Sequence, residues 1–110
     1  MILSGTTRAG ITAFMKALST QVAPFGITAN VVAPGGVLTG RLIELLEAKS
    51  KAENRSYEVL LKESEKSIPL GRFATPDELA KYVVFLCSNE ALYVTGTNTN
   101  IDGGLSRSVG

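Results

Sequence analysis

The chain has 110 residues, of which 45% are apolar and 19% are charged, and its net charge is +1. This composition is typical of one small globular domain, and a near-neutral charge gives no field that would attract nucleic acid or an acidic membrane. No histidine is present and Cys87 is the only cysteine, which excludes histidine-based triads, clustered imidazole or thiolate metal centres and an intrachain disulfide. A lone cysteine is also typical of the reducing cytoplasm, where we expect the protein to be located.

The first third of the chain predicts a helix, a tight turn and a buried strand. Apolar side chains recur at helical spacing at Ile11, Phe14, Met15, Leu18 and Val22. Pro24 cannot continue a helix, and Gly26 suits the turn that follows. The uncharged run Ile27–Ala33 then predicts a strand that is buried on both faces of a parallel sheet, and it stops abruptly at Pro34-Gly35-Gly36.

Residues 39–67 predict two short helices with a polar break between them. Leucine and isoleucine cluster at the start of this segment, a polar run covers Lys49–Ser56, and Tyr57, Leu60 and Leu61 resume the helical spacing. An excursion of this length after a strand often covers a substrate. A purely structural insertion is the alternative interpretation.

The segment Thr75–Glu78, with the sequence TPDE, predicts the start of another helix. Thr75 can cap the helix, Pro76 suits its first position, and Glu78 stands where a capping box needs a carboxylate. The apolar stripe that follows runs to about Ser88 and predicts that Cys87 is buried, while Tyr82 and Tyr93 are expected in the core or at an interface. A last strand is expected over Thr97–Ile101, closed by Gly103-Gly104.

This pattern gives two strands and about four helices, which is half of a repeating α/β architecture. Two parallel strands bury little surface and leave edges open, so a doubly wound fold needs further strands. The apolar faces of Ile11–Val22 and Leu79–Leu86 therefore need another surface to cover them. We expect self-assembly, with domain swapping as one route, or a missing partner segment.

Two long segments, Arg8–Thr39 and Ile68–Gly104, together resemble the short-chain dehydrogenase/reductase family, in particular its 3-oxoacyl-acyl-carrier-protein reductase-like members. The resemblance implies the C-terminal half of a doubly wound Rossmann-type parallel sheet, with residues 1–110 as a single partial domain. It also implies NAD or NADP as cofactor, hydride transfer to or from a small carbonyl or alcohol substrate, and a homo-oligomer such as a dimer or tetramer.

The resemblance also implies where the cofactor is held. Pro34, Gly35 and Gly36 stand where the family places its strand end against the nicotinamide, and Val37 and Thr39 stand where it holds the carboxamide. A position beyond the carboxyl end of a strand suits ligands in open α/β sheets. A plain turn is the alternative interpretation of Pro34–Gly36.

The family's catalytic tyrosine and lysine, four residues apart on the first helix, correspond here to Ser4 and Arg8. Arg8 keeps a cation that could hold ribose hydroxyls. Ser4 has a much shorter and less acidic hydroxyl than a phenol, whose pKa is already about 10. Three interpretations stay open: a divergent oxidoreductase, a homologue that binds nucleotide without turnover, and an assembly module.

Overall fold

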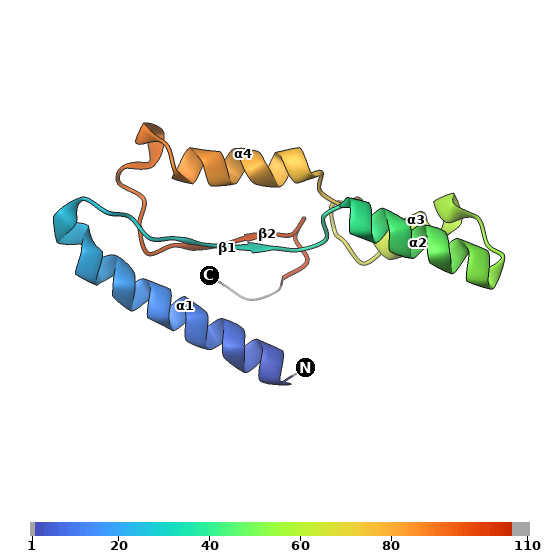
Figure 1. The fold of residues 1–110 in the computed structure, drawn as a ribbon, viewed down its shortest axis with the longest axis horizontal. Coiled ribbons are helices and arrows are strands. Elements are labelled where there is room, and N and C mark those ends of the chain that lie inside the picture. The colour runs from blue at the N-terminus through green and yellow to red at the C-terminus, as the bar shows by residue number, and fades with distance from the viewer. Residues whose placement is uncertain (1, 107–110) are drawn as a thin grey trace. The chain divides into compact units, whose positions relative to one another are not determined.

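The computed structural model describes residues 2–106, and side chains from Thr6 onward. Within this range the elements follow one another as Figure 1 shows. They are helix α1 (Ile2–Val22), the 3-10 helix η1 (Ala23–Phe25), strand β1 (Val31–Pro34), helices α2 (Gly40–Glu53), α3 (Tyr57–Glu65) and α4 (Pro76–Leu86), the 3-10 helix η2 (Asn89–Ala91) and strand β2 (Asn98–Ile101). The two strands and four α-helices predicted from the sequence are confirmed. None of the helices in the described range is long and apolar enough to cross a bilayer.

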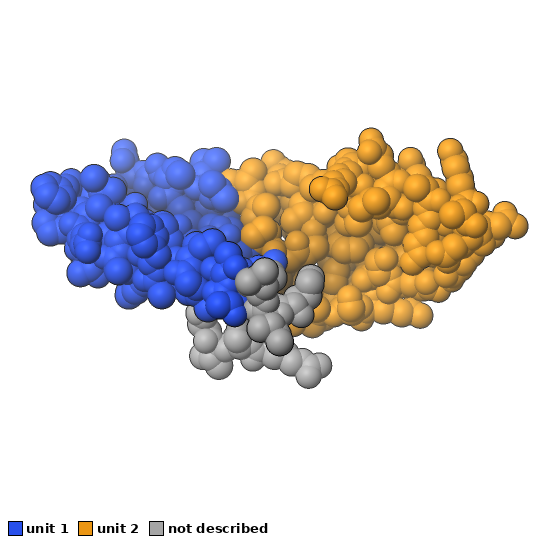
Figure 2. All heavy atoms as spheres, turned by 60° about the horizontal axis from the view of Figure 1, so that its bottom comes forward, with its two compact units in different colours: residues 1–33, 82–99, 110 blue, residues 34–81, 100–109 orange. Residues whose placement is uncertain are grey.

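The described residues group into two compact units, which Figure 2 shows in different colours. Unit 1 comprises residues 2–33 and 82–99, and unit 2 comprises residues 34–81 and 100–106.

The sheet consists of β1 and β2, which run parallel and side by side (Figure 1). The N–H of Val31 donates to the carbonyl of Thr97 at 2.8 Å, and the N–H of Gly35 donates to the carbonyl of Ile101 at 2.9 Å. Because both partners advance by the same four residues, the pairing is in register along the whole length of β1.

Strand β1 begins at Val31, four residues later than the sequence predicts, because the side chain of Asn30 intervenes. Its Nδ2 donates to the carbonyl of Val94 at 3.1 Å, and its Oδ1 accepts from the N–H of Thr97 at 3.1 Å. The N–H of Ala29 likewise bonds a side chain, Thr95 Oγ1, at 3.0 Å. The side chains of Asn30 and Thr95 thus make hydrogen bonds that backbone groups would make if the strand were longer. Asn and Thr side chains typically compete with backbone–backbone hydrogen bonds in this way.

Unit 1 has almost no apolar core. Ala91 is its only buried hydrophobic residue among those described. The predicted stripe on α1 does form, but Ile11 and Phe14 are 53% and 65% exposed. The buried residue Ser19 is polar, and its hydroxyl donates to the carbonyl of Lys16 at 2.6 Å. The expectation that the apolar faces of this half lack a cover is confirmed for this unit.

Two side chains expected at buried positions are in fact exposed. The prediction of a buried Cys87 is wrong, because α4 ends at Leu86 and Cys87 lies exposed just beyond the helical stripe. Tyr93 is fully exposed, so it does not lie in the core of this chain, and a place at an interface remains the prediction for it. Tyr82 is half-buried, and its hydroxyl lies 3.0 Å from Thr99 Oγ1.

Unit 2 holds the other buried hydrophobic residues, Leu46, Leu60 and Ile68. The first two lie on α2 and α3, which pack side by side as a helical hairpin. The predicted polar break is narrower than expected, because α2 continues to Glu53 and ends at Asn54, which has a left-handed φ of 51°. Asn tolerates this conformation better than most residues, so it makes a short connection possible.

Helix α4 begins with the capping box that TPDE predicts. The N–H of Glu78 donates to Thr75 Oγ1 at 3.1 Å, and the N–H of Thr75 donates to Glu78 Oε1 at 2.9 Å. Two backbone donors at the start of the helix are thereby satisfied reciprocally.

We expect Thr75→Ala to lower the free energy of unfolding by about 1 kcal/mol, since the first turn of α4 loses its side-chain acceptor. Urea unfolding followed by circular dichroism would measure this loss. Thr75→Ser keeps the hydroxyl and should behave like the natural chain. Equal stability of the alanine and serine variants would contradict a role for the cap.

Candidate functional site

The segment Pro34–Thr39 begins with the last residue of β1 and continues beyond the carboxyl end of the strand, as predicted. On one side Gly35 bonds to Ile101 of β2. On the other side the carbonyl of Gly36 accepts from the N–H of Ala74 at 3.0 Å, and the N–H of Leu38 donates to the carbonyl of Ala74 at 2.9 Å. The turn is therefore held by backbone hydrogen bonds from two different segments, which makes it a rigid part of unit 2.

Gly35 and Gly36 are required by protein packing. A Cβ at Gly35 would lie 2.6 Å from Asp102 Cβ and 2.8 Å from its Cα. A Cβ at Gly36 would lie 2.6 Å from Phe73 Cδ1. The space that a side chain would fill is thus taken by Asp102 and Phe73, so the interpretation of these glycines as a plain turn has a sufficient physical basis. Their role beside a nicotinamide remains a prediction.

Val37 and Thr39 present polar groups that a ligand could use. No acceptor for the N–H of Val37 is found among residues 2–106, and its carbonyl accepts from the N–H of Thr39 at 2.9 Å. Thr39 also caps α2, because its Oγ1 accepts from the N–H of Leu42 at 3.3 Å. The Thr39 hydroxyl keeps its own proton and one more lone pair. A free amide donor and a hydroxyl are the groups that fit a carboxamide.

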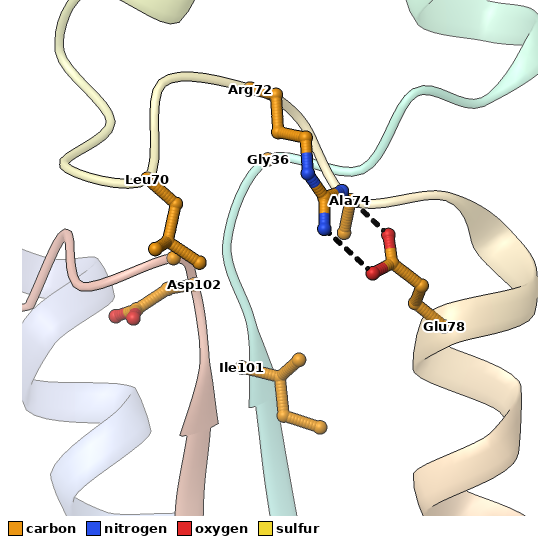
Figure 3. A pocket seen from close by; sticks show the side chains of 8 residues that line it. Gly36, Leu70, Arg72, Ala74, Glu78, Ile101 and Asp102 are labelled. Carbon is orange, nitrogen blue, oxygen red and sulfur yellow. Dashed lines mark hydrogen bonds and ion pairs between the residues drawn. The ribbon is translucent and has the colours of Figure 1, made fainter.

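A small pocket of about 110 Å³ lies beside this turn, and Figure 3 shows the side chains around it. It is lined by Gly36, Leu70, Arg72, Ala74, Glu78, Ile101, Asp102 and Gly103. In Figure 3 the guanidinium of Arg72 faces the carboxylate of Glu78, to which it donates at 2.7 and 2.8 Å. Arg72 and Glu78 thus form an exposed ion pair at the edge of this pocket. The pocket is too small to enclose a dinucleotide.

The charged side chains at this pocket stabilise the fold. Hydrogen bonds from Arg72, and after them one from the backbone of Thr75, lower the pKa of Glu78 from 4.5 to about 2. Because the pKa of Glu78 is lower in the folded chain than its ordinary value, the charged carboxylate stabilises the fold. This stabilisation is complete above pH 4.5 and is lost as the pH falls to about 2. Asp102 is engaged as well, since it accepts from the N–H groups of Gly104 and Ser106 at 3.0 and 2.9 Å.

Ser4 and Arg8 both belong to α1, and residues four apart lie on one face of a helix. Arg8 is exposed, and the side chain of Ser4 lies outside the described part of the structure. Both residues belong to unit 1, whereas Pro34–Thr39 belongs to unit 2. Within residues 2–106 no cluster of acidic or cysteine side chains is arranged to hold a metal ion.

Three supporting residues were not recognised in the sequence: Phe73, Ala74 and Asp102, which surround the turn. They come from segments far from Gly35 in the chain, so no local sequence pattern predicts that they contact the turn.

The fold and the turn define a class of protein. A parallel α/β sheet whose strand ends in a rigid glycine turn is the arrangement at which Rossmann-type folds bind their ligands. Residues 3–106 match the family model described as enoyl-(acyl carrier protein) reductase. The chain therefore belongs to the short-chain dehydrogenase/reductase family, and its predicted fold class is confirmed.

Known relatives agree with this assignment. The chain is 40% identical over 103 residues to the 3-oxoacyl-[acyl-carrier-protein] reductase of Aquifex aeolicus, a match that covers 91% of this chain and 36% of that protein. It is 38% identical over 104 residues to the cyclohexanol dehydrogenase of a Rhodococcus species, covering 94% of this chain and 35% of the relative. The chain thus spans little more than a third of the length of these curated relatives.

Solved structures show the same correspondence. L-sorbose reductase from Gluconobacter frateurii, in complex with NADPH and L-sorbose, superposes with a TM-score of 0.86 at 33% identity, over 94% of this chain and 40% of that chain. An NADPH-bound short-chain oxidoreductase from Pseudomonas aeruginosa, described as containing an atypical catalytic center, gives a TM-score of 0.78 at 30% identity, over 99% of this chain and 40% of its own.

Proposed function

We propose that this chain forms the C-terminal part of an NAD(P)-dependent oxidoreductase that interconverts a small carbonyl compound and its alcohol. The observation that carries the proposal is the Val37 N–H, which has no acceptor among residues 2–106 and lies on a rigid turn beyond the carboxyl end of β1. The NADPH-bound relatives support NAD or NADP as the cofactor. The single cysteine favours the reducing cytoplasm, and this location stays a prediction.

Each residue at the turn has a defined part in this proposal. Bound NAD(P)H supplies the hydride. The Val37 N–H and the Thr39 hydroxyl would hold the carboxamide of the cofactor, while Thr39 continues to cap α2. Gly35 and Gly36 keep the turn close to Asp102 and Phe73, which fixes the direction of the Val37 N–H. Orientation of this kind is how a protein assists hydride transfer.

The remaining residues act at the cofactor ribose and at the substrate. Arg8 contributes a permanent cation that bonds ribose hydroxyls or stabilises a developing negative charge. The hairpin of α2 and α3, within residues 39–67, covers the substrate. Ser4 lacks the acidity of a phenol, so the proton of the alcohol passes through another group or turnover is slow.

Binding of the nucleotide without turnover is the second candidate function, and the Ser4 and Arg8 pair favours it. The Pseudomonas oxidoreductase described as having an atypical catalytic center was nevertheless solved with NADPH bound. An atypical catalytic center and bound NADPH therefore occur together in that protein.

A chimera tests the proposal directly. Residues 3–106 replace the matching part of the Gluconobacter L-sorbose reductase, and NADPH binding is titrated by nucleotide fluorescence. We expect the chimera to bind NADPH. The 110-residue chain alone should bind negligibly, because the phosphate-holding part of a Rossmann fold lies elsewhere. Val37→Pro, which removes the free N–H, should weaken binding about tenfold, the equivalent of one hydrogen bond.

Val37→Ala is the matched control, since it keeps the N–H and should bind like the unmodified chimera. A folded chimera that does not bind NADPH would refute the proposal. Equal affinity of the proline and alanine variants would show that the Val37 amide does not contact the cofactor.

A further inference from the structure

The direction of the Val37 N–H, which carries the proposed function, is fixed by another segment of unit 2. Val37 forms an isolated parallel bridge with Ala74. In a parallel bridge one residue bonds through both of its backbone groups to the two neighbours of the other. Here Ala74 makes both bonds, since its N–H donates to the carbonyl of Gly36 at 3.0 Å and its carbonyl accepts from the N–H of Leu38 at 2.9 Å. The backbone groups of Val37 therefore point away from Ala74.

The segment that carries Ala74 has little regular structure of its own. Residues 71–75 precede α4 and form no helix or strand beyond the bridge at Ala74. A backbone of this kind has many accessible conformations, so it holds one of them only where other contacts restrict it. The ring of Phe73 is one such contact, because it fills the space next to Gly36.

Arg72 and Glu78 restrict this segment at both ends. The two Nη atoms of Arg72 donate to the two carboxylate oxygens of Glu78 (Figure 3), and Nη1 also donates to the carbonyl of Phe73 at 3.2 Å. The same carboxylate accepts from the N–H of Thr75 at 2.9 Å. One carboxylate thus joins the residues on either side of Phe73 and Ala74, which contact the turn.

The geometry of this ion pair matters more than its strength. Its side chains are 55% and 44% exposed, and exposed ion pairs contribute little to stability because water and salt screen them. A bidentate arginine–carboxylate pair is directional, however, so it holds the backbone on both sides in one arrangement. The exposed pair of Lys81 and Asp77 differs in this respect, since it joins two residues one turn apart within α4.

We infer that Arg72 and Glu78 are a positioning pair for the turn that presents the Val37 N–H. The pair holds Phe73 and Ala74 in place, and Ala74 in turn directs the N–H of Val37. Neither charged residue touches the cofactor, because both act through the backbone of Ala74. The inference rests on the proposed function for its ligand, the nicotinamide carboxamide, whereas the coupling between the pair and the turn is independent of any ligand.

Hydrogen exchange of the 110-residue chain tests this coupling without a cofactor. Arg72→Met keeps much of the side-chain length but removes the charge and every donor, while Glu78 can still cap α4. The N–H groups of Leu38 and Ala74, which close the bridge, should then exchange about threefold to fivefold faster than in the natural chain, the effect of an exposed ion pair. In the NADPH-binding chimera the dissociation constant should rise by a similar factor, because fewer molecules present the Val37 N–H in the binding direction.

Two further variants complete the experiment. Lys81→Met also removes a cation and an exposed ion pair, the one with Asp77, so exchange at the bridge and NADPH affinity should match those of the natural chain. Arg72→Lys keeps the cation but not the planar fork, so its exchange rates should lie between those of Arg72→Met and the natural chain. Circular dichroism of each variant shows whether the helices are retained. If Arg72→Met does not fold, Arg72→Lys decides, with faster exchange than in the natural chain as the expected result.

The outcomes separate this inference from the proposed function. Unchanged exchange at Leu38 and Ala74 in the Arg72 variants, or equal acceleration in Lys81→Met, would overturn the inference whether or not the chimera binds NADPH. Faster exchange with undiminished NADPH affinity would overturn it as well, since the pair would then not position the turn for the cofactor. Faster exchange in a chain whose chimera does not bind NADPH would support the coupling and refute the proposed function.

Discussion

Gly35→Ala is expected to lower the free energy of unfolding by about 1–3 kcal/mol, the range for overpacking a close contact. The new methyl group would overlap the Cα and Cβ of Asp102, which are backbone-linked atoms with little freedom to move. Relief would require the ends of β1 and β2 to separate, with loss of the hydrogen bond from Gly35 to Ile101. Chemical unfolding of the variant and the natural chain would measure the difference.

Gly10→Ala provides the matched control. Apart from the neighbouring residues and backbone of its own helix, no atom lies within 4 Å of the position its methyl group would take, and Gly10 is in the interior of α1. Alanine favours a helix over glycine by about 0.5–1 kcal/mol, so this variant should be more stable than the natural chain. A Gly35→Ala variant as stable as Gly10→Ala would show that the strand ends are not packed as closely as described.

Ser4→Tyr combined with Arg8→Lys is expected to raise the turnover of the NADPH-binding chimera by about 10²–10⁴-fold, the usual contribution of a positioned proton donor. The two positions lie four residues apart on α1, so both new side chains would share one face of the helix. Steady-state reduction of L-sorbose would measure the gain, because that sugar is bound by the reductase that supplies the rest of the chimera.

Ser4→Phe with Arg8→Lys separates proton transfer from simple packing, since phenylalanine has the ring without the hydroxyl. The phenylalanine variant should stay as slow as the unmodified chimera. A tyrosine variant without any gain would show that the proton already passes through a different residue.

Local patterns predicted the helices well because their signals are short-range. Pro24 and Gly26 mark the end of α1, and the TPDE sequence forms the expected reciprocal cap. The boundaries that shifted depend on contacts across the chain. Asn30 shortens β1 by bonding Val94 and Thr97, which are more than sixty residues away and give no local signal.

The candidate site was predictable in its location but not in its supports. The helix–strand pattern and the family resemblance placed Pro34–Thr39 at a strand end, and the structure agrees. That Asp102 and Phe73 fill the space beside the two glycines could not be read from their spacing, because such contacts depend on tertiary packing. The apolar residues before Cys87 predict that it is buried. It is exposed because unit 1 has almost no apolar core among the described residues.

The uneven distribution of buried side chains gives the two units different cooperativity. Among the residues whose side chains are described, Leu46, Leu60 and Ile68 are the buried hydrophobic residues of unit 2, whereas Ala91 is the only one in unit 1. Fluctuations that open α1 therefore break few apolar contacts, while those that separate α2 from α3 expose Leu46 and Leu60, the buried side chains of these two helices. Heating should melt the chain in stages, with the α2–α3 hairpin as the last structured segment to be lost.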